Sequence, residues 1–155
     1  STGATRITYL VHEVHLPVDS DREVHGNATI QGSYVLRIAA VAAQRGHGVA
    51  ILHSHPGGRG WPGLSGPDAD AENSYARLGE QVTGLPLVGL TLSGDATWSA
   101  RSWNDGRPEW AGSVRRVGTA LTASWNDELV PPAGLEASQD RTISAWGDSR
   151  HRDIT

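Results

Sequence analysis

Residues 49–56 read Val-Ala-Ile-Leu-His-Ser-His-Pro, and this stretch decides both the fold and the chemistry that we expect. Its first four residues form a continuous apolar run, which is typical of a central strand buried on both faces. Side chains two positions apart in a strand point to the same face, so His53 and His55 project together if the strand continues. Pro56 removes a backbone donor and favours an exit from the sheet at that point.

The residues before this strand predict one further strand and one helix. Residues 7–14 (ITYLVHEV) are β-branched, aromatic and apolar, which favours a strand. Ser33 has the character of a helix N-cap, and apolar residues follow it at helical spacing as far as Gly46.

The residues after it begin with a glycine-rich loop, 57–63, and a second helix. Ser65, Pro67 and several acidic residues mark the start of that helix, because prolines and carboxylates favour the first helical turn. We expect the helix to end at Gly79.

Strand signals follow the second helix. Residues 87–92 and 96–103 predict a strand pair joined at Gly94-Asp95, and residues 114–125 predict one more strand. The order of strands and helices favours an α/β domain with a mixed β-sheet flanked by helices.

Composition limits the class of protein. The chain has 155 residues, 37% of them apolar and 19% charged, which suits a single globular domain. The net charge of -4 offers no electrostatic reason to expect nucleic acid or an anionic membrane as partner. Since neither a signal peptide nor a run of ~20 apolar residues is visible, we expect a cytoplasmic protein.

Three residue types are missing or skewed. There is no Cys, so any metal must be held by histidines and carboxylates. There is no Met, and we therefore expect the chain, which begins at Ser1, to be a piece of a longer protein. Its cations are all Arg, a usage that suggests a high-GC bacterial genome.

The candidate site consists of His53, His55 and Asp68, with Ser65 beside the acid. The glycine-rich loop returns the chain, so Asp68 in the first turn of the second helix can face the two imidazoles. Two imidazoles and one carboxylate, with a fourth position open, are the donor set of a catalytic zinc site. The string from Ser65 to Asp68 also fits a helix capping box, and the two interpretations are compatible.

These residues resemble a known motif. His53-Ser54-His55-Pro56 followed by Ser65-x-x-Asp68 is similar to the JAMM motif, H-[ST]-H-P…S-x-x-D, of JAB/MPN-domain zinc metalloproteases. The resemblance extends over roughly residues 6 to 104, from the order of the expected elements. Nine residues separate His55 from Ser65, where the commonest family pattern has seven, and the glycine-rich loop can absorb the difference.

The resemblance implies an MPN-like fold, with the layering of cytidine deaminases, and a set of roles. His53, His55 and Asp68 would bind Zn2+, and Ser65 would stabilise the tetrahedral oxyanion. The family reaction is hydrolysis of a peptide or isopeptide bond after the C-terminus of ubiquitin or a ubiquitin-like protein. We also expect Trp61, in the loop between the motif halves, to contact substrate.

The resemblance does not assign the general base to a single residue of this chain. Glu13 is the candidate within the chain, and it lies in His12-Glu13-Val14-His15, whose histidines are three apart where the zinc motif H-E-x-x-H needs four. We therefore interpret His12 and His15 as surface or loop residues. In JAMM proteins the glutamate precedes or lies on the first strand, so the alternative is a glutamate upstream of Ser1.

The tail carries a second resemblance. Gln139-Asp140-Arg141, Ala145-Trp146-Gly147 and Asp153-Ile154-Thr155 are similar to the arm that opens ThiF-type adenylating domains, which are relatives of ubiquitin-activating enzymes. Pro131-Pro132 would be the linker. We thus divide the chain into a JAB/MPN domain, 1–130, and a linker with the start of a ThiF-like domain, 131–155; an ordinary polar tail is the alternative.

Three functions are compatible with these sequence patterns. The first is a zinc peptidase that matures or removes a ubiquitin-like protein. The second is a non-catalytic MPN scaffold that binds partners, although such scaffolds tend to lose the ligands that this chain keeps. The third is a PHP-type phosphoesterase, which also uses H-x-H but needs a longer chain and more ligands.

Overall fold

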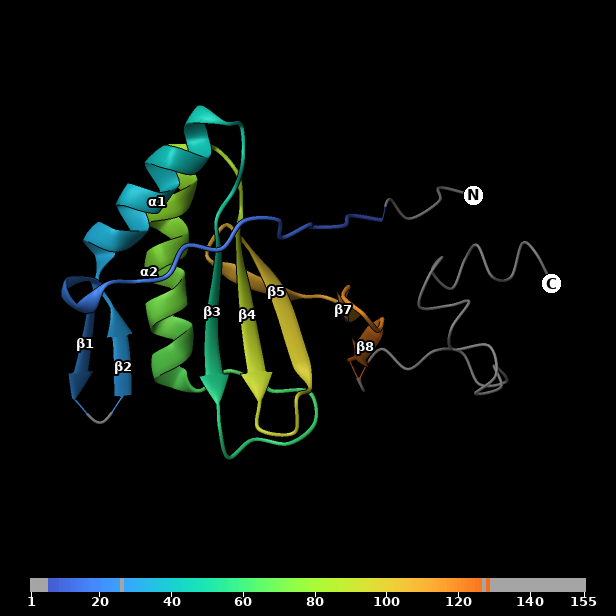
Figure 1. Cartoon of the computed structure of the whole chain (residues 1–155). Helices are drawn as coiled ribbons and strands as arrows, with labels where there is room; N and C mark the ends of the chain where they lie inside the picture. Colours follow the sequence, from blue (N-terminus) through green and yellow to red (C-terminus); the bar gives the residue numbers. More distant parts are fainter. Residues whose placement is uncertain (1–5, 26, 127, 129–155) are drawn as a thin grey trace, which may run out of the picture.

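The computed structural model describes residues 6–25, 27–126 and 128. Its centre is a four-stranded sheet in the order β3-β4-β5-β6, in which β3 and β4 are parallel and the other neighbours antiparallel. The strands are β3 (Ala50–His55), β4 (Leu87–Ser93), β5 (Trp98–Asn104) and β6 (Arg107–Trp110). Helices α1 (Gly32–Gln44) and α2 (Gly66–Thr83) stand side by side next to β3 (Figure 1). The predicted α/β class and mixed sheet are confirmed.

Two small hairpins accompany the central sheet. A single 3-10 turn, η1 (Asp19–Asp21), leads into β1 (Arg22–His25), which pairs with β2 (Asn27–Ile30) before α1 begins. Strands β7 (Ser113–Arg116) and β8 (Thr122–Trp125) form the second hairpin, beyond β5 in Figure 1. The prediction of one strand over 114–125 is wrong, because the chain reverses between its two halves. Strands β1, β2 and β6 were not predicted.

The predicted strand at 7–14 is also wrong. The described residues from 6 to 18 form neither helix nor strand, and Ile7, Leu10 and Val14 are exposed. A strand needs a partner for its backbone groups, and β-branched composition alone does not supply one. This segment is held by isolated contacts, such as the bond from the Tyr34 hydroxyl to the His15 carbonyl at 2.6 Å.

The helix boundaries correct two further predictions. The N-cap of α1 is Gln31, which makes no side-chain capping bond, and Ser33 lies inside the first turn. Helix α2 does not stop at Gly79 but continues to Thr83 and ends at Gly84, whose φ of 69° is left-handed. Gly79 is buried within the helix, and the Leu87 side chain lies 3.6 Å from the position that a Cβ would occupy there.

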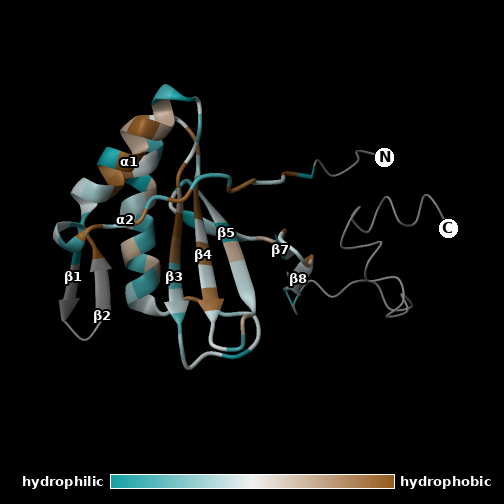
Figure 2. Ribbon diagram, viewed as in Figure 1, coloured by the Kyte–Doolittle hydropathy of each residue, from teal (hydrophilic) through white to brown (hydrophobic). Residues whose placement is uncertain are grey.

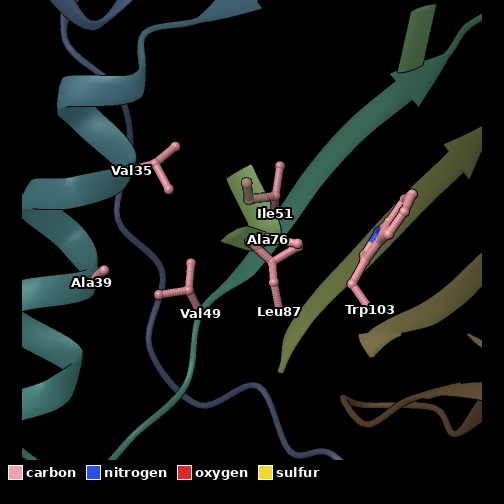
Figure 3. Close-up of a cluster of buried hydrophobic side chains, with 7 residues drawn as sticks. All are labelled: Val35, Ala39, Val49, Ile51, Ala76, Leu87 and Trp103. Atoms are coloured by element: carbon pink, nitrogen blue, oxygen red, sulfur yellow. The ribbon is translucent and has the colours of Figure 1, made fainter. Parts of the chain in front are cut away.

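The hydrophobic core lies between the two helices and one face of the sheet. Its buried members are Val35, Ala39, Val49, Ile51, Ala76, Leu87 and Trp103 (Figure 3). Ala39 of α1 and Ala76 of α2 are small, which favours close packing of the two helices against each other and of α2 against β4. Figure 2 shows the apolar stretches of α1 and of the central strands.

Strand β3 connects this core to the candidate site. Its side chains alternate between the two faces of the sheet, with Ile51 buried and His53 and His55 half-buried on the same face. The two histidines share one face, as predicted, and it is the face that carries the buried Ile51. The prediction of a central strand buried on both faces is wrong, because β3 lies at the edge of the described sheet and Ala50 and Leu52 are exposed. Among the described residues, no helix combines the length and apolar character needed to cross a bilayer. The predicted linker and ThiF-like segment, 131–155, lie outside the described residues.

Leu87 tests this assignment of the core. Its side chain is 1% exposed, so Leu87→Ala removes buried apolar contacts and leaves a cavity, and we expect a loss of about 2–5 kcal/mol in unfolding free energy. Leu85→Ala is the matched control, because Leu85 is 40% exposed and its truncation should change stability by less than about 0.5 kcal/mol. Chemical denaturation measures both. Equal effects would contradict this placement of the core.

Candidate metal centre

The structure brings His53, His55 and Asp68 together. The Nε2 atom of His55 lies 3.2 Å from His53 Nε2 and 3.2 Å from Asp68 Oδ2, and the third edge, from His53 Nε2 to Asp68 Oδ2, is 4.0 Å. Nitrogen and oxygen ligands at 2.0–2.1 Å from a tetrahedral zinc ion are about 3.3 Å apart. The three atoms thus fit one metal ion, and no other such group occurs among the residues that the structure describes.

The loop between the motif halves is tied to the sheet. Gly58 donates its amide to the carbonyl of His55 at 2.9 Å and accepts at its own carbonyl from Gly94 at 3.0 Å. Further along the loop, Ser99 donates to the carbonyl of Pro62 at 2.7 Å. A side chain at Gly94 would meet the carbonyl oxygen of Pro56 at 2.1 Å, so the close approach of the β4–β5 turn requires glycine.

Ser65 and Asp68 form the predicted capping box at the start of α2. The Asp68 amide donates to Ser65 Oγ at 3.3 Å, and the Ser65 amide donates to Asp68 Oδ2 at 3.2 Å. The Ser65 hydroxyl also donates to Asp68 Oδ2, at 2.6 Å. That oxygen is the atom that faces the histidines, so the helix cap holds the carboxylate in the site.

The electrostatic environment favours the metal-binding forms of His53 and Asp68. Burial lowers the pKa of His53, and the nearby charges of Asp68 and Glu72 offset this only in part. Burial by itself would raise the pKa of Asp68, but hydrogen bonds from Ser65 and the proximity of His53 and His55 outweigh it, so the pKa is lowered. A neutral imidazole and an ionised carboxylate are the states in which these groups bind metal.

A buried polar cluster lies directly behind His53. Glu72 accepts from Arg101 Nε at 2.8 Å and from Trp103 Nε1 at 2.8 Å, and its other oxygen accepts from Arg101 Nη2. Arg101 Nη1 donates to Thr91 Oγ1 at 2.7 Å. The two ends of the cluster reach the imidazole, with Glu72 Oε1 3.5 Å from His53 Nδ1 and Thr91 Oγ1 3.4 Å from His53 Nε2.

Sequence analysis missed this cluster. Glu72 entered it only as an acidic residue of the first helical turns, yet it follows Asp68 by four positions, which places both on one helix face. That spacing is the available signal. Gly89, opposite them on β4, leaves the necessary room, since a Cβ there would lie 2.3 Å from Glu72 Oε2 and 2.7 Å from Arg101 Nε.

Glu13 is not part of the group of ligands in the structure. Its exposed carboxylate pairs with Arg45, the residue that follows α1, and with His15 at 3.3 Å. The rings of His12 and His47 are in edge contact, with centroids 4.6 Å apart. These contacts fasten the N-terminal segment near the C-terminal end of α1, and the role of Glu13 as base stays a prediction.

Trp61 lines a cavity of about 340 Å3 together with Gly63, Trp110, Asn126 and Glu128. The ring of Trp110 lies 5.4 Å from the guanidinium carbon of Arg101, so this cavity adjoins the buried cluster. The contact of Trp61 with substrate remains a prediction, and the structure places this residue of the loop between the motif halves at a concave surface.

Comparisons with protein-family models, with curated proteins and with solved structures found no match for this chain.

Ser65 tests the helix cap. We expect Ser65→Ala to lower the free energy of unfolding by about 1 kcal/mol, because the Asp68 amide loses its acceptor. Ser74→Ala, on the same helix, is the matched control: Ser74 is exposed and bonds only the Asp70 carbonyl, so the change should stay within about 0.5 kcal/mol. Urea denaturation measures the difference, and a Ser65→Ala protein as stable as Ser74→Ala would argue against the cap.

Proposed function

We propose that this protein is a zinc-dependent peptidase or isopeptidase that cleaves after the C-terminus of a ubiquitin-like protein, for maturation or deconjugation. The observation that carries the proposal is the convergence of two imidazole nitrogens and one carboxylate oxygen within 4.0 Å at the end of β3. Three protein ligands leave a fourth tetrahedral position for water or substrate, as in catalytic zinc sites.

The substrate class comes from the resemblance alone. The pattern from His53 to Asp68 is similar to the JAMM motif, and that family acts on ubiquitin-like proteins. The proposed partners are therefore a ubiquitin-like protein or its conjugates, together with a ThiF-like adenylating domain in the same polypeptide. Neither nucleic acid nor membrane is proposed as a partner, and the proposed location is the cytoplasm of a bacterium.

Each residue of the site has its own proposed role. When bound, zinc polarises the scissile carbonyl and lowers the pKa of its water to about 7. His53, His55 and Asp68 hold the ion, and the helix cap keeps Asp68 oriented. Ser65 is placed beside the ligands, and its hydroxyl stabilises the oxyanion if it turns from Asp68 toward substrate, a contribution of up to about 4 kcal/mol in oxyanion holes.

Proton transfer requires a carboxylate within about 2.6–3.2 Å of the attacking water or one further water away. Glu72 does not suit this step, because it is 2% exposed and accepts bonds from Arg101 and Trp103. Glu13 pairs with Arg45 away from the ligands. We therefore favour a base that precedes Ser1, and we keep Glu13 as the alternative.

The position of Glu13 also favours a second candidate function. A zinc-binding MPN-type scaffold would keep the three ligands, would need no base, and would recognise a partner without cleaving it. Metal content supports both functions, and only turnover separates them.

Metal analysis tests the ligand assignment. We expect about one zinc ion per chain in the protein, from the three converging ligands, and its loss in His53→Ala and His55→Ala because two protein ligands remain. His47→Ala is the control, since His47 is exposed and contacts His12, and it should retain the metal. Full zinc occupancy in both His53→Ala and His55→Ala would refute the site.

Turnover of a cleavable ubiquitin-like fusion tests the base. We expect this chain to bind zinc but to cleave poorly, and a chain extended at its N-terminus to cleave well with Ser65→Ala slowing it. Glu13→Gln should then have no effect in the extended chain, like the control Glu80→Gln on the exposed side of α2. If the unextended chain cleaves efficiently and Glu13→Gln abolishes cleavage, Glu13 is the base.

A further inference from the structure

We propose that Glu72, Arg101 and Thr91 set the tautomer of His53, so that Nδ1 carries the ring hydrogen and Nε2 keeps a free lone pair. These three residues would be positioning residues for a metal ligand. The part of the proposal that concerns zinc rests on the proposed function, whereas the tautomer itself does not.

The guanidinium of Arg101 has five donors and no acceptor. Its Nη1 lies 2.7 Å from Thr91 Oγ1, so the threonine oxygen must accept that bond. The hydroxyl hydrogen of Thr91 is then available for another acceptor. Thr91 is 0% exposed, so water does not supply that acceptor.

His53 Nε2 is the acceptor that the structure offers to Thr91. The two atoms are 3.4 Å apart, and the described residues offer the hydroxyl hydrogen no other acceptor, although the oxygen keeps a second lone pair beside the one that Arg101 occupies. The arrangement that satisfies this buried donor has a lone pair at Nε2. A neutral imidazole with a bare Nε2 carries its hydrogen on Nδ1.

The other side of the ring leads independently to the same assignment. Glu72 Oε1 lies 3.5 Å from His53 Nδ1, and an ionised carboxylate can only accept. Arg101 holds Glu72 in place from the far side through two nitrogens, and Gly89 keeps the space open. The reverse tautomer would set a nitrogen lone pair against the carboxylate and an N–H against the hydroxyl that needs an acceptor.

These contacts connect the position of the ring hydrogen of His53 to the proposed metal site. The bare Nε2 is the atom that lies 3.2 Å from His55 Nε2 and 4.0 Å from Asp68 Oδ2. In the metal-free protein this lone pair accepts from Thr91; a bound ion would replace that contact, while the contact of Nδ1 with Glu72 would be kept. Carboxylates that orient metal-binding histidines in this way typically contribute 10–100-fold to metal affinity.

Nuclear magnetic resonance of the metal-free wild-type protein is the direct test. Long-range proton–nitrogen spectra of 15N-histidine-labelled protein, at a pH where His53 is neutral, report which ring nitrogen bears hydrogen. We expect a protonated Nδ1 and a bare Nε2 for His53, assigned by the loss of its signals in His53→Ala. A protonated Nε2 would overturn the proposal.

Two variants then connect the tautomer to metal affinity, measured with Zn2+ in competition with a chelator. Thr91→Val keeps the side-chain volume and removes the hydroxyl, and it should increase the share of His53 with hydrogen on Nε2 in the metal-free protein. Glu72→Gln should weaken Zn2+ binding about 10–100-fold. Because Glu72→Gln leaves Arg101 without its charged partner and can unfold the domain, Thr91→Val carries the test.

Thr122→Val, on exposed β8, is the matched control and should leave both readouts unchanged. A folded Thr91→Val protein with the wild-type tautomer would overturn the positioning role of Thr91, and a folded Glu72→Gln protein with the wild-type affinity for Zn2+ would overturn that of Glu72. If the wild-type protein binds no zinc, the proposed function and the metal role of this cluster both fail, while the spectra of the metal-free protein still decide the tautomer.

Discussion

The buried ion pair between Glu72 and Arg101 is the interaction on which the rest of the structure depends. It joins α2 to β5 across the face of β4, and both side chains are almost fully removed from solvent. Two charges in such a place are tolerated only when they are paired and hydrogen-bonded. The pair therefore dictates its surroundings: a glycine at position 89, an indole donor at Trp103 and a hydroxyl at Thr91.

The same pair determines where the candidate metal centre can form. It brings the first turns of α2 toward the end of β3, so that Asp68 reaches His55 at 3.2 Å. Asp68 serves at once as a capping-box residue and as a candidate ligand, through one carboxylate oxygen. Loosening the start of α2 would therefore disturb the ligand geometry, and the stability of that helix terminus and the affinity for metal should vary together.

The elements that sequence analysis predicted correctly depend on local signals. The apolar run before His53 predicted β3, and the string from Ser65 to Asp68 predicted the start of α2. The wrong predictions concern segments whose structure is decided by contacts with residues far away in the sequence. Residues 7–14 have the composition of a strand but pair with no strand among the described residues, and α2 continues past Gly79, which is buried near Leu87, to a left-handed cap at Gly84.

The sequence by itself determined which residues can hold a metal, because the two-residue period of a strand and the first turn of a capped helix set the directions of His53, His55 and Asp68. Only the tertiary structure decided what surrounds them. Thr91, Glu72 and Arg101 come from three elements, and Arg101 lies 29 positions after Glu72. No periodicity relates such distant residues; packing α2 against the sheet brings them to His53 and separates Glu13 from the ligands.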